Sequence, residues 1–307
     1  MKFTKMQGAG NDFVVIETSD TQRDWSAMAI AACDRHYGAG ADGLLLMMPS
    51  SLADFRMRIF NADGSEASAC GNGLRCLVKH FADNGAKDKA PEISVETAAG
   101  VRRVAIYREA GGVAKIQTGM GKPRFGEKDI PVIIGKGRGN LVNIKTMMNY
   151  TLGAGSRRLS LNLVSMGNPH AVYFYHRPVA GFPLSRIGPK VENHQIFPRG
   201  VNFEVARVLG RQQIEGRVWE EGVGETLACG SGACAMVAAA RLHGYVDSRV
   251  EVMLPGGTLE VEWDGVGEVL LGGPAETVFS GEWPEDKLPL KTAPPRTKGL
   301  YVTGKTN

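Results

Sequence analysis

The segment ACGNG at residues 69–73 recurs later in the chain as ACGSG at residues 228–232. Each segment opens a predicted helix that ends on a glycine, at Gly85 in the first copy and at Gly244 in the second. The two cysteines and the two terminal glycines are both separated by 159 positions (229 − 70 and 244 − 85). This constant offset indicates duplication. It predicts two thiols, one in each matching half, that face each other across a cleft.

The composition excludes several classes of protein. The chain has 307 residues, enough for one large or two medium domains, and its net charge of +4 is small. We therefore expect no nucleic-acid partner, since that would require a clustered basic face. No apolar run approaches the ~20 residues of a membrane span, and five cysteines are too few and odd in number for a secreted disulfide framework. We expect a cytoplasmic protein without a membrane partner.

The hydrophobic pattern predicts an α/β (α+β) protein in which one order of elements appears twice. Each half reads as strand, helix, strands, helix and strands, which implies pseudo-symmetric domains with the site between them. Residues 121–156, including most of a basic stretch at 136–158, read as a connection and solvated loop, with one strand at Pro131–Ile134. The tail after Trp283 reads as peripheral. The predicted helices are 25–33, 74–84, 184–194 and 233–242, and the predicted strands are 13–16, 44–48, 55–60, 93–96, 101–107, 113–117, 159–165, 171–175, 201–208, 214–219, 250–253, 258–263 and 269–271.

Each cysteine loop can both bind an anion and activate a thiol. A glycine-rich turn that leads into a helix leaves backbone N–H groups free for a substrate carboxylate, here at residues 71–72 and 230–231. The same field favours a thiolate. No glycine-rich phosphate loop with the required context is present in the sequence, and no lysine stands out as a Schiff-base partner. We therefore expect no cofactor, and two sulfur bases that remove a proton from one face of a carbon and return one to the other.

The cysteines could also serve other roles, which their spacing tests. Cys33, Cys76 and Cys234 fit small buried core residues. The spacings C-x5-C and C-x4-C around the two loops do not match the paired spacings of a structural zinc site, so we expect no metal. The Cys-x-x-Cys of a redox dithiol is absent. A non-catalytic amino-acid-binding protein remains an alternative from another class.

Polar residues recur near the ends of strands in matched positions. Alignment on the cysteines places Asn61 against Glu220, and Gly10-Asn11 resembles Gly167-Asn168. Asparagine both donates and accepts, which suits an ammonium and a carboxylate together. His170 is a candidate for proton transfer. The asparagines that we expect to contact a ligand are Asn11, Asn61, Asn168 and Asn202.

Together these motifs resemble the diaminopimelate epimerase family, from residue 2 to about residue 283 and in family order. The resemblance implies a cofactor-independent epimerase that interconverts LL- and meso-2,6-diaminopimelate in the lysine and cell-wall precursor pathway. The segments that carry it are GAGNDF (8–13), DRHYG (34–38), GADG (40–43), NADGSE (61–66), CGNGLRC (70–76), GNPH (167–170), GETLACGSGACA (224–235) and GPA (273–275).

The resemblance also implies roles and boundaries. It implies that the thiols of Cys70 and Cys229 are the two acid/base groups, and that His170 and Glu220 support proton transfer and bind the reacting amino group. It implies two similar domains, each a mixed sheet wrapped around a central helix, covering residues 1–122 plus about 275–307 and residues 123–274. A homodimer is a further implication. The implied carboxylate seat and substrate contacts are Gly71, Asn72, Gly230, Ser231, Asn11, Asn61, Asn168 and Asn202.

One position departs from the family pattern. The family usually has Glu-Arg-Gly before the second loop, where this chain has Glu220-Glu221-Gly222. That arginine belongs to the grip on the distal carboxylate of the substrate, which a glutamate would repel. The alternative is therefore a related racemase, independent of pyridoxal phosphate, with a different side-chain specificity.

Overall fold

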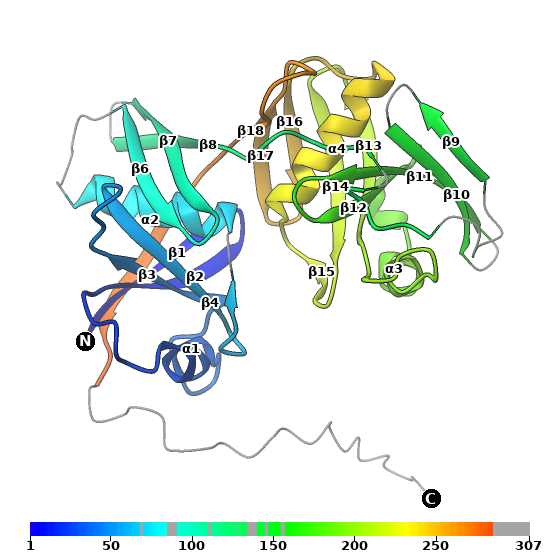
Figure 1. Ribbon diagram of the computed structural model, residues 1–307. Helices are drawn as coiled ribbons and strands as arrows, with labels where there is room; N and C mark the ends of the chain where they lie inside the picture. Colours follow the sequence, from blue (N-terminus) through cyan, green and yellow to red (C-terminus); the bar gives the residue numbers. More distant parts are fainter. Residues whose placement is uncertain are drawn as a thin grey trace, which may run out of the picture.

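The computed structural model describes residues 1–67, 70–84, 91–109, 112–126, 128–133, 140–144, 147–154 and 157–284. The described residues form a mixed α/β fold in which the strands belong to one continuous sheet and a few helices pack against it. Figure 1 shows two groups of elements, each built around one long helix. The predicted fold class is thereby confirmed.

The first group contains both ends of the described chain, because its last strand returns to pair with its first. Its elements are β1 (Lys2–Gly8), β2 (Asn11–Glu17), α1 (Trp25–Cys33), β3 (Gly43–Met48), β4 (Phe55–Asn61), β5 (Glu66–Ala67), α2 (Gly71–Asp83), β6 (Glu92–Thr97), β7 (Gly100–Glu109), β8 (Gly112–Gly119) and β19 (Glu276–Glu282).

The second group follows in the chain and joins the first through the pairing of β18 with β8. Its elements are β9 (Asn140–Ile144), β10 (Met147–Ala154), β11 (Arg157–Ser165), β12 (Pro169–Phe174), the short 3-10 helix η1 (Val179–Gly181), α3 (Leu184–Glu192), β13 (Asn202–Gly210), β14 (Gln213–Glu220), β15 (Gly224–Thr226), α4 (Gly230–His243), β16 (Arg249–Leu254), β17 (Gly257–Glu262) and β18 (Leu270–Gly273).

Strand pairing repeats between the two groups, as the duplicated sequence predicts. The parallel pair β2 and β3 corresponds to β12 and β13, and the parallel pair β4 and β6 corresponds to β14 and β16. The register matches as well, since Phe13 pairs with Gly43 as His170 pairs with Asn202. Asn202 and Gly43 are again 159 positions apart (202 − 43), so the offset of the cysteine loops extends into the sheet.

The two central helices begin directly after the two cysteines. Helix α2 is buried on all sides from Asn72 to Val78 and is more exposed toward its end, while every residue of α4 from Ala233 to Ala240 is buried. Most of these α4 residues are alanines, which allows the strands of the second group to pack closely against the helix that lies across them in Figure 1. The helix ends at Gly244, whose φ of 78° is the left-handed conformation that glycine adopts at low cost.

The predicted connection between the halves was partly wrong. Residues 140–154 contain the hairpin of β9 and β10, and β10 pairs with β11 in the main sheet. Met148, Tyr150 and Leu152 are spaced two apart and pack into the same hydrophobic cluster, as residues on one face of a strand do, while Met147 packs into another cluster. The expected strand at Pro131–Ile134 is also wrong for residues 131–133, which form no strand. The predicted helix end at Gly85, residues 136–139 and the tail from 285 lie outside the described residues.

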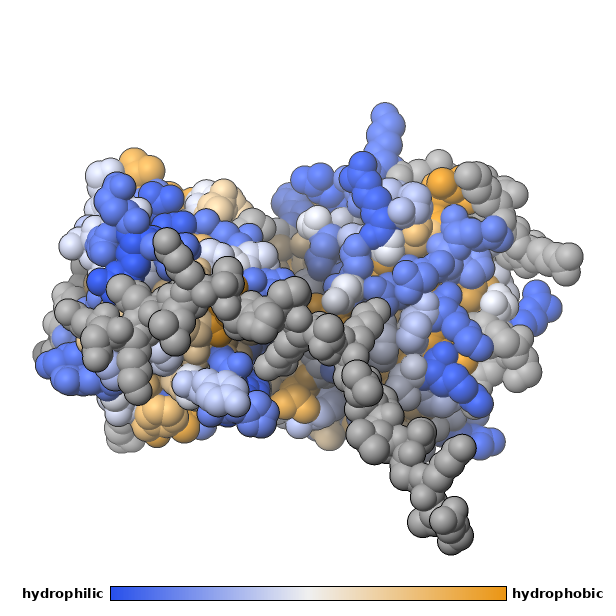
Figure 2. All heavy atoms as spheres, turned by 90° about the horizontal axis from the view of Figure 1, so that it is seen from below, coloured by the Kyte–Doolittle hydropathy of each residue, from blue (hydrophilic) through white to orange (hydrophobic). Residues whose placement is uncertain are grey.

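The strands β1, β5 and β15 were not expected from the sequence, and β19 was not assigned from its pattern, although the resemblance places residues from about 275 in the first domain. The face of the molecule in Figure 2 is mostly hydrophilic, with hydrophobic side chains in small separate patches. Among the described residues, no helix is both long and apolar enough to cross a bilayer.

Candidate active site

Each cysteine of the two loops is the residue that caps its helix. Cys70 has an extended backbone (φ −150°), and its sulfur accepts the N–H of Gly73 at 3.4 Å. Cys229 repeats this geometry (φ −124°), with its sulfur 3.4 Å from the N–H of Gly232. A sulfur here takes the place of the side-chain oxygen that normally caps a helix. Both thiols therefore lie where the helix field favours negative charge.

One methyl group of Leu271 locates the two loops relative to each other. A methyl group added to Gly71 would lie 3.4 Å from Leu271 Cδ2, and one added to Gly230 would lie 2.9 Å from the same atom. The first residues of α2 and α4 therefore both approach Leu271, on β18. The two cysteine loops therefore lie close together beside Leu271, as the predicted shared site requires.

Glu220 lies close enough to act on both sulfurs. Burial is the main cause that raises the pKa of the Cys70 thiol, and the Glu220 charge adds to it. At Cys229, burial and then the same Glu220 carboxylate raise the pKa well above its ordinary value. Glu220 stands at the end of β14, and its Oε1 accepts a hydrogen bond of 2.6 Å from the Thr226 hydroxyl. This bond fixes the carboxylate whose charge acts on both thiols.

The thiols differ from the sequence expectation in one respect. The helix-start N–H groups do lower the pKa of each thiol, as expected, but burial outweighs them and the net direction is upward. Cys33, Cys76 and Cys234 are core residues as predicted, and burial raises the pKa of each to about 12. All five cysteines are free thiols.

A chain of amides connects Cys70 to a buried cation. Arg75 Nη2 donates to Asn72 Oδ1 at 2.7 Å, and Asn72 Nδ2 donates to Asn11 Oδ1 at 3.2 Å. At the other end, Asn11 Nδ2 donates to Asp42 Oδ2 at 2.7 Å. Arginine only donates and a carboxylate only accepts, so the two ends fix the orientation of both amides. Asn11 Oδ1 therefore faces the Cys70 sulfur, 3.9 Å away.

A second polar group lies behind Cys229. His170 Nδ1 is 2.6 Å from Glu204 Oε1, and its Nε2 is 3.0 Å from Asn168 Oδ1. Both His170 and Glu204 are fully buried. A methyl group added to Gly232 would lie 3.1 Å from Glu204 Oε1, so the pair is separated from the second cysteine loop by that glycine alone.

The remaining predicted residues lie at three places. Ser231 Oγ is 3.4 Å from the Cys229 sulfur. Asn202 is buried and donates to the Pro169 carbonyl at 2.9 Å, while its Oδ1 accepts the backbone N–H of Glu221 at 3.1 Å. Asn61 ends β4 with an exposed side chain that donates to Ser65 Oγ, so its hydrogen bond does not join it to the other predicted residues.

Sequence reasoning missed Arg75, Glu204 and Leu271. For two of them the sequence does contain a signal, a charged residue within an apolar stretch. Arg75 is a charge on the buried side of a helix, between Leu74 and Cys76, and Glu204 is an acid within the apolar strand that follows Asn202. Charged residues at buried positions are rare unless paired. Leu271 gave no signal, because an apolar residue in a strand is ordinary.

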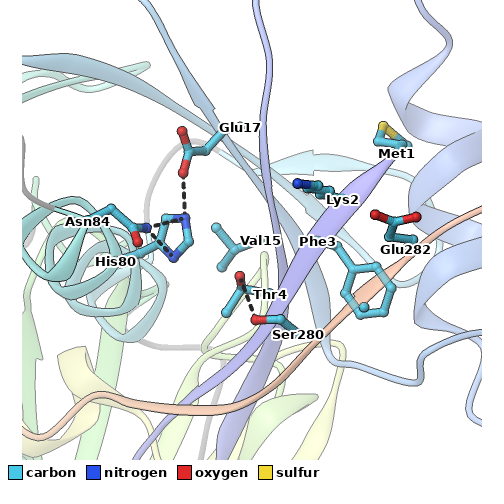
Figure 3. A pocket seen from close by; sticks show the side chains of 11 residues that line it. Met1, Lys2, Phe3, Thr4, Val15, Glu17, His80, Asn84, Ser280 and Glu282 are labelled. Atoms are coloured by element: carbon cyan, nitrogen blue, oxygen red, sulfur yellow. Dashed lines mark hydrogen bonds and ion pairs between the residues drawn. The ribbon is translucent and has the colours of Figure 1, made fainter.

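The described residues contain no group of three or more His, Cys, Asp or Glu arranged to hold a metal ion. A hollow of about 650 Å³ lies elsewhere, on the first group between β1, β19 and the end of α2. Figure 3 shows its lining, with His80 hydrogen bonded to Glu17 and Asn84, and Thr4 to Ser280. Neither helix-capping cysteine borders it, so this hollow is separate from the candidate site.

Comparison with known proteins gives matches in both groups of elements. The family model described as diaminopimelate epimerase matches residues 3–126 and 162–278. A diaminopimelate epimerase of Agathobacter rectalis is 45% identical over 92% of this chain and 99% of its own length. One of Pelotomaculum thermopropionicum is 44% identical over 92% of this chain and 99% of its own. The chain belongs to the diaminopimelate epimerase family.

Solved structures extend the likeness of the fold. A phenazine biosynthesis protein of the PhzF family from Bacillus anthracis superposes with a TM-score of 0.65 at 18% identity, covering 92% of this chain and 98% of that one. A probable proline racemase of Agrobacterium radiobacter gives a TM-score of 0.61 at 16% identity, covering 93% of each chain. At these identities the likeness concerns the fold alone.

Proposed function

We propose that this protein interconverts LL- and meso-2,6-diaminopimelate without a cofactor, as an isomerase of amino-acid biosynthesis. The observation that carries the proposal is the approach of both cysteine loops to the same Leu271 methyl group, with Glu220 acting on both thiols. The names of the relatives support the choice of substrate.

In the proposed reaction, one sulfur enters as thiolate and takes the α-proton, while the other enters as thiol and gives its proton to the opposite face. The free N–H groups at the starts of α2 and α4 hold the α-carboxylate, at Gly71, Asn72, Gly230 and Ser231. His170 and Glu220 bind the reacting amino group and support proton transfer. The asparagines Asn11, Asn61, Asn168 and Asn202 contact the rest of the substrate.

We propose the domain division that the resemblance implies, with residues 1–122 and about 275–307 as one domain and 123–274 as the other. The antiparallel pairing of β19 with β1 supports this division. A cytoplasmic location is proposed because all five cysteines are free thiols, which a reducing compartment preserves. A homodimer is proposed from the family resemblance.

The test is the activity of the purified protein in buffer with a chelator and without pyridoxal phosphate. LL-diaminopimelate is added, and the stereoisomers are followed by chiral chromatography. We expect the meso isomer to form, and Cys70→Ala or Cys229→Ala to abolish its formation. Cys33→Ala is the matched control, because this buried thiol of α1 lies outside the site, and we expect it to retain activity. Undiminished turnover in both site variants would reject the two-cysteine mechanism.

A second candidate is a racemase acting on a side chain without a distal carboxylate. The observation in its favour is Glu221, whose side chain lies against Gly200 and whose N–H binds the substrate contact Asn202. A panel of diamino and basic amino acids separates the two candidates. Turnover of diaminopimelate alone would reject the racemase, and turnover of a basic amino acid alone would reject the epimerase. Binding without turnover of any of these would favour a non-catalytic binding protein.

A further inference from the structure

Beside each cysteine loop lies one buried ionisable side chain that has no ionised counterpart at the matched position of the other half. Glu204 and Leu45 occupy matched positions, 159 apart (204 − 45), beneath the loop glycines. A methyl group on Gly73 would lie 2.9 Å from Leu45 Cδ2, and one on Gly232 would lie 3.1 Å from Glu204 Oε1. Because the first half packs a leucine at this position, the architecture does not require an acid there.

The surroundings of Glu204 are those of a functional acid. Its Oε1 is bound by His170, and its Oε2 has no hydrogen-bond partner among the described residues. Burial raises the pKa of Glu204, and the nearby Glu220 charge opposes ionisation further, while His170 favours it. A buried carboxyl group that is only partly satisfied costs stability, so its presence calls for a role beyond packing.

Arg75 is the opposite charge, on the side of Cys70. Its matched position in the second half is Cys234 (234 − 75 is again 159). The guanidinium is fully buried, donates to Asn72 and, weakly, to the Pro274 carbonyl, and its Nη1 has no partner among the described residues. Its charge acts on the thiols of Cys70, Cys76 and Cys234.

We propose that Arg75 and Glu204 are positioning residues that make the two sulfurs unequal, so that Cys70 gives up its proton at a lower pH than Cys229. This inference rests on the proposed function, in which the two thiols share one proton. The charged and polar groups that act on Cys70 are Arg75, Glu220, the N–H groups of Gly73 and Asn72, and Asn11 Oδ1, which accepts from the thiol and favours its protonated form. Those that act on Cys229 are Glu220, Glu204 with its partner His170, Ser231 and the N–H of Gly232.

The balance of these groups favours Cys70 as the thiolate. Burial and Glu220 raise the pKa of both thiols, and Glu220 is the second cause at Cys229 but the last at Cys70. Arg75 and Glu204 each act on one thiol only: Arg75 lowers the pKa of Cys70, and Glu204 raises the pKa of Cys229 further. In a turnover that starts with Cys70 as the thiolate, Cys70 gains the substrate proton and Cys229 loses its own. The number of protons on the protein is unchanged, and the charge has moved to the less favourable sulfur.

The test measures each thiol separately in the intact protein. The rate of alkylation by iodoacetamide is followed from about pH 6 to the highest pH at which the protein stays folded, and it is assigned to each cysteine by fragment-ion mass spectrometry. The midpoint of each pH profile reports thiolate formation, whereas unequal access to reagent changes only the plateau. We expect the midpoint of Cys70 to lie at least about one pH unit below that of Cys229, a tenfold difference in thiolate at lower pH. Coincident or reversed midpoints in the unmodified protein would overturn the proposal without any variant.

Variants then assign the difference to the two residues. Glu204→Gln should lower the midpoint of Cys229 by about one unit and leave that of Cys70 nearly unchanged. Arg75→Gln keeps a donor for Asn72 but removes the charge, so it should raise only the midpoint of Cys70, and Arg75→Lys should restore it. Variants that shift both midpoints equally, or neither, would refute the assignment. Because alkylation needs no turnover, an inactive protein with unequal midpoints would contradict the proposed function and leave the asymmetry intact.

Discussion

Gly256→Ala tests whether the site depends on close contact between the two halves. Gly256 lies in the turn between β16 and β17, and Ala9 lies in the turn between β1 and β2. A methyl group on Gly256 would lie 2.2 Å from the backbone oxygen of Ala9 and 3.0 Å from Leu227 Cβ. Ala9 already has a φ of 53°, which an alanine adopts only with strain, so its backbone has little freedom to adjust.

The size of the effect follows from this distance. Restoring ordinary contact requires a movement of about 1 Å between the turn and Ala9. Asn11 is only two residues from Ala9, and its Oδ1 faces the Cys70 sulfur, so the movement displaces a group that contacts the reacting thiol. A misplacement of this size costs about 10²-fold in rate, and the overpacking costs about 1–3 kcal/mol of unfolding free energy.

The assay is the initial rate of epimerisation with thermal unfolding measured in parallel. We expect kcat to fall about 10²-fold while the protein stays folded at the assay temperature. Gly153→Ala in β10 is the matched control, because a methyl group there meets nothing within 4 Å, and we expect wild-type kcat. A Gly256→Ala protein with wild-type kcat would refute the reasoning, since the two turns would then not position the site.

Three further predictions concern stability and pH. Gly188→Ala places a methyl group 2.4 Å from the ring of Trp219, and we expect a loss of about 1–3 kcal/mol in denaturant unfolding; an unchanged midpoint would show that the ring moves freely. Burial opposes ionisation of Asp12, but hydrogen bonds from Arg35 and Lys5 outweigh it and hold its pKa at about 2. Ionised Asp12 therefore stabilises the fold above its unfolded pKa of about 3.9, and this stabilisation is lost as the pH falls toward 2. Asp12→Asn should make the free energy of unfolding fall less steeply with decreasing pH. An equally steep fall in the variant would contradict this. Burial and then Glu192 raise the pKa of Glu221. Acidification should therefore remove the charge of Glu221 and lower KM for diaminopimelate, and Glu221→Gln should abolish this pH dependence. If the dependence persisted in the variant, Glu221 would not face the distal carboxylate.

Much of the fold could be predicted because the duplication repeats at the level of residues. The 159-residue offset relates the cysteines, the loop glycines and the strands β3 and β13, while the partner strands β2 and β12 are offset by 157 residues (170 − 13), so one recognised half predicts most of the other. The helix at Trp25–Cys33 matched its pattern because Asp24 caps it and accepts the N–H of Ala27. The hairpin of β9 and β10 was missed because glycine-rich flanking sequence obscured the alternation in β10.

The candidate site was predictable where chemistry is local and not where it depends on distant partners. The capping role of each cysteine follows from its neighbours in sequence. By contrast, Arg75 is hydrogen bonded to Asn72 and to the distant Pro274, and Glu204 is hydrogen bonded to His170, 34 positions away. The sequence alone does not show these partners. The sequence also gave the wrong sign for the thiols, because burial is a tertiary property that outweighs the local N–H donors.

The central claim is that two different groups act on opposite faces of one carbon. Its most direct test is the reaction of unlabelled LL-diaminopimelate in D₂O, stopped at low conversion, with deuterium at the α-carbon measured in both isomers. A two-base mechanism predicts one deuterium in the newly formed meso isomer, because the second sulfur delivers a deuteron from solvent. It predicts almost none in the recovered LL isomer, because the sulfur that removes the proton still carries that proton and can return only it. Deuterium that appears in the recovered LL isomer as fast as in the product would mean that one base serves both faces, and would contradict the account.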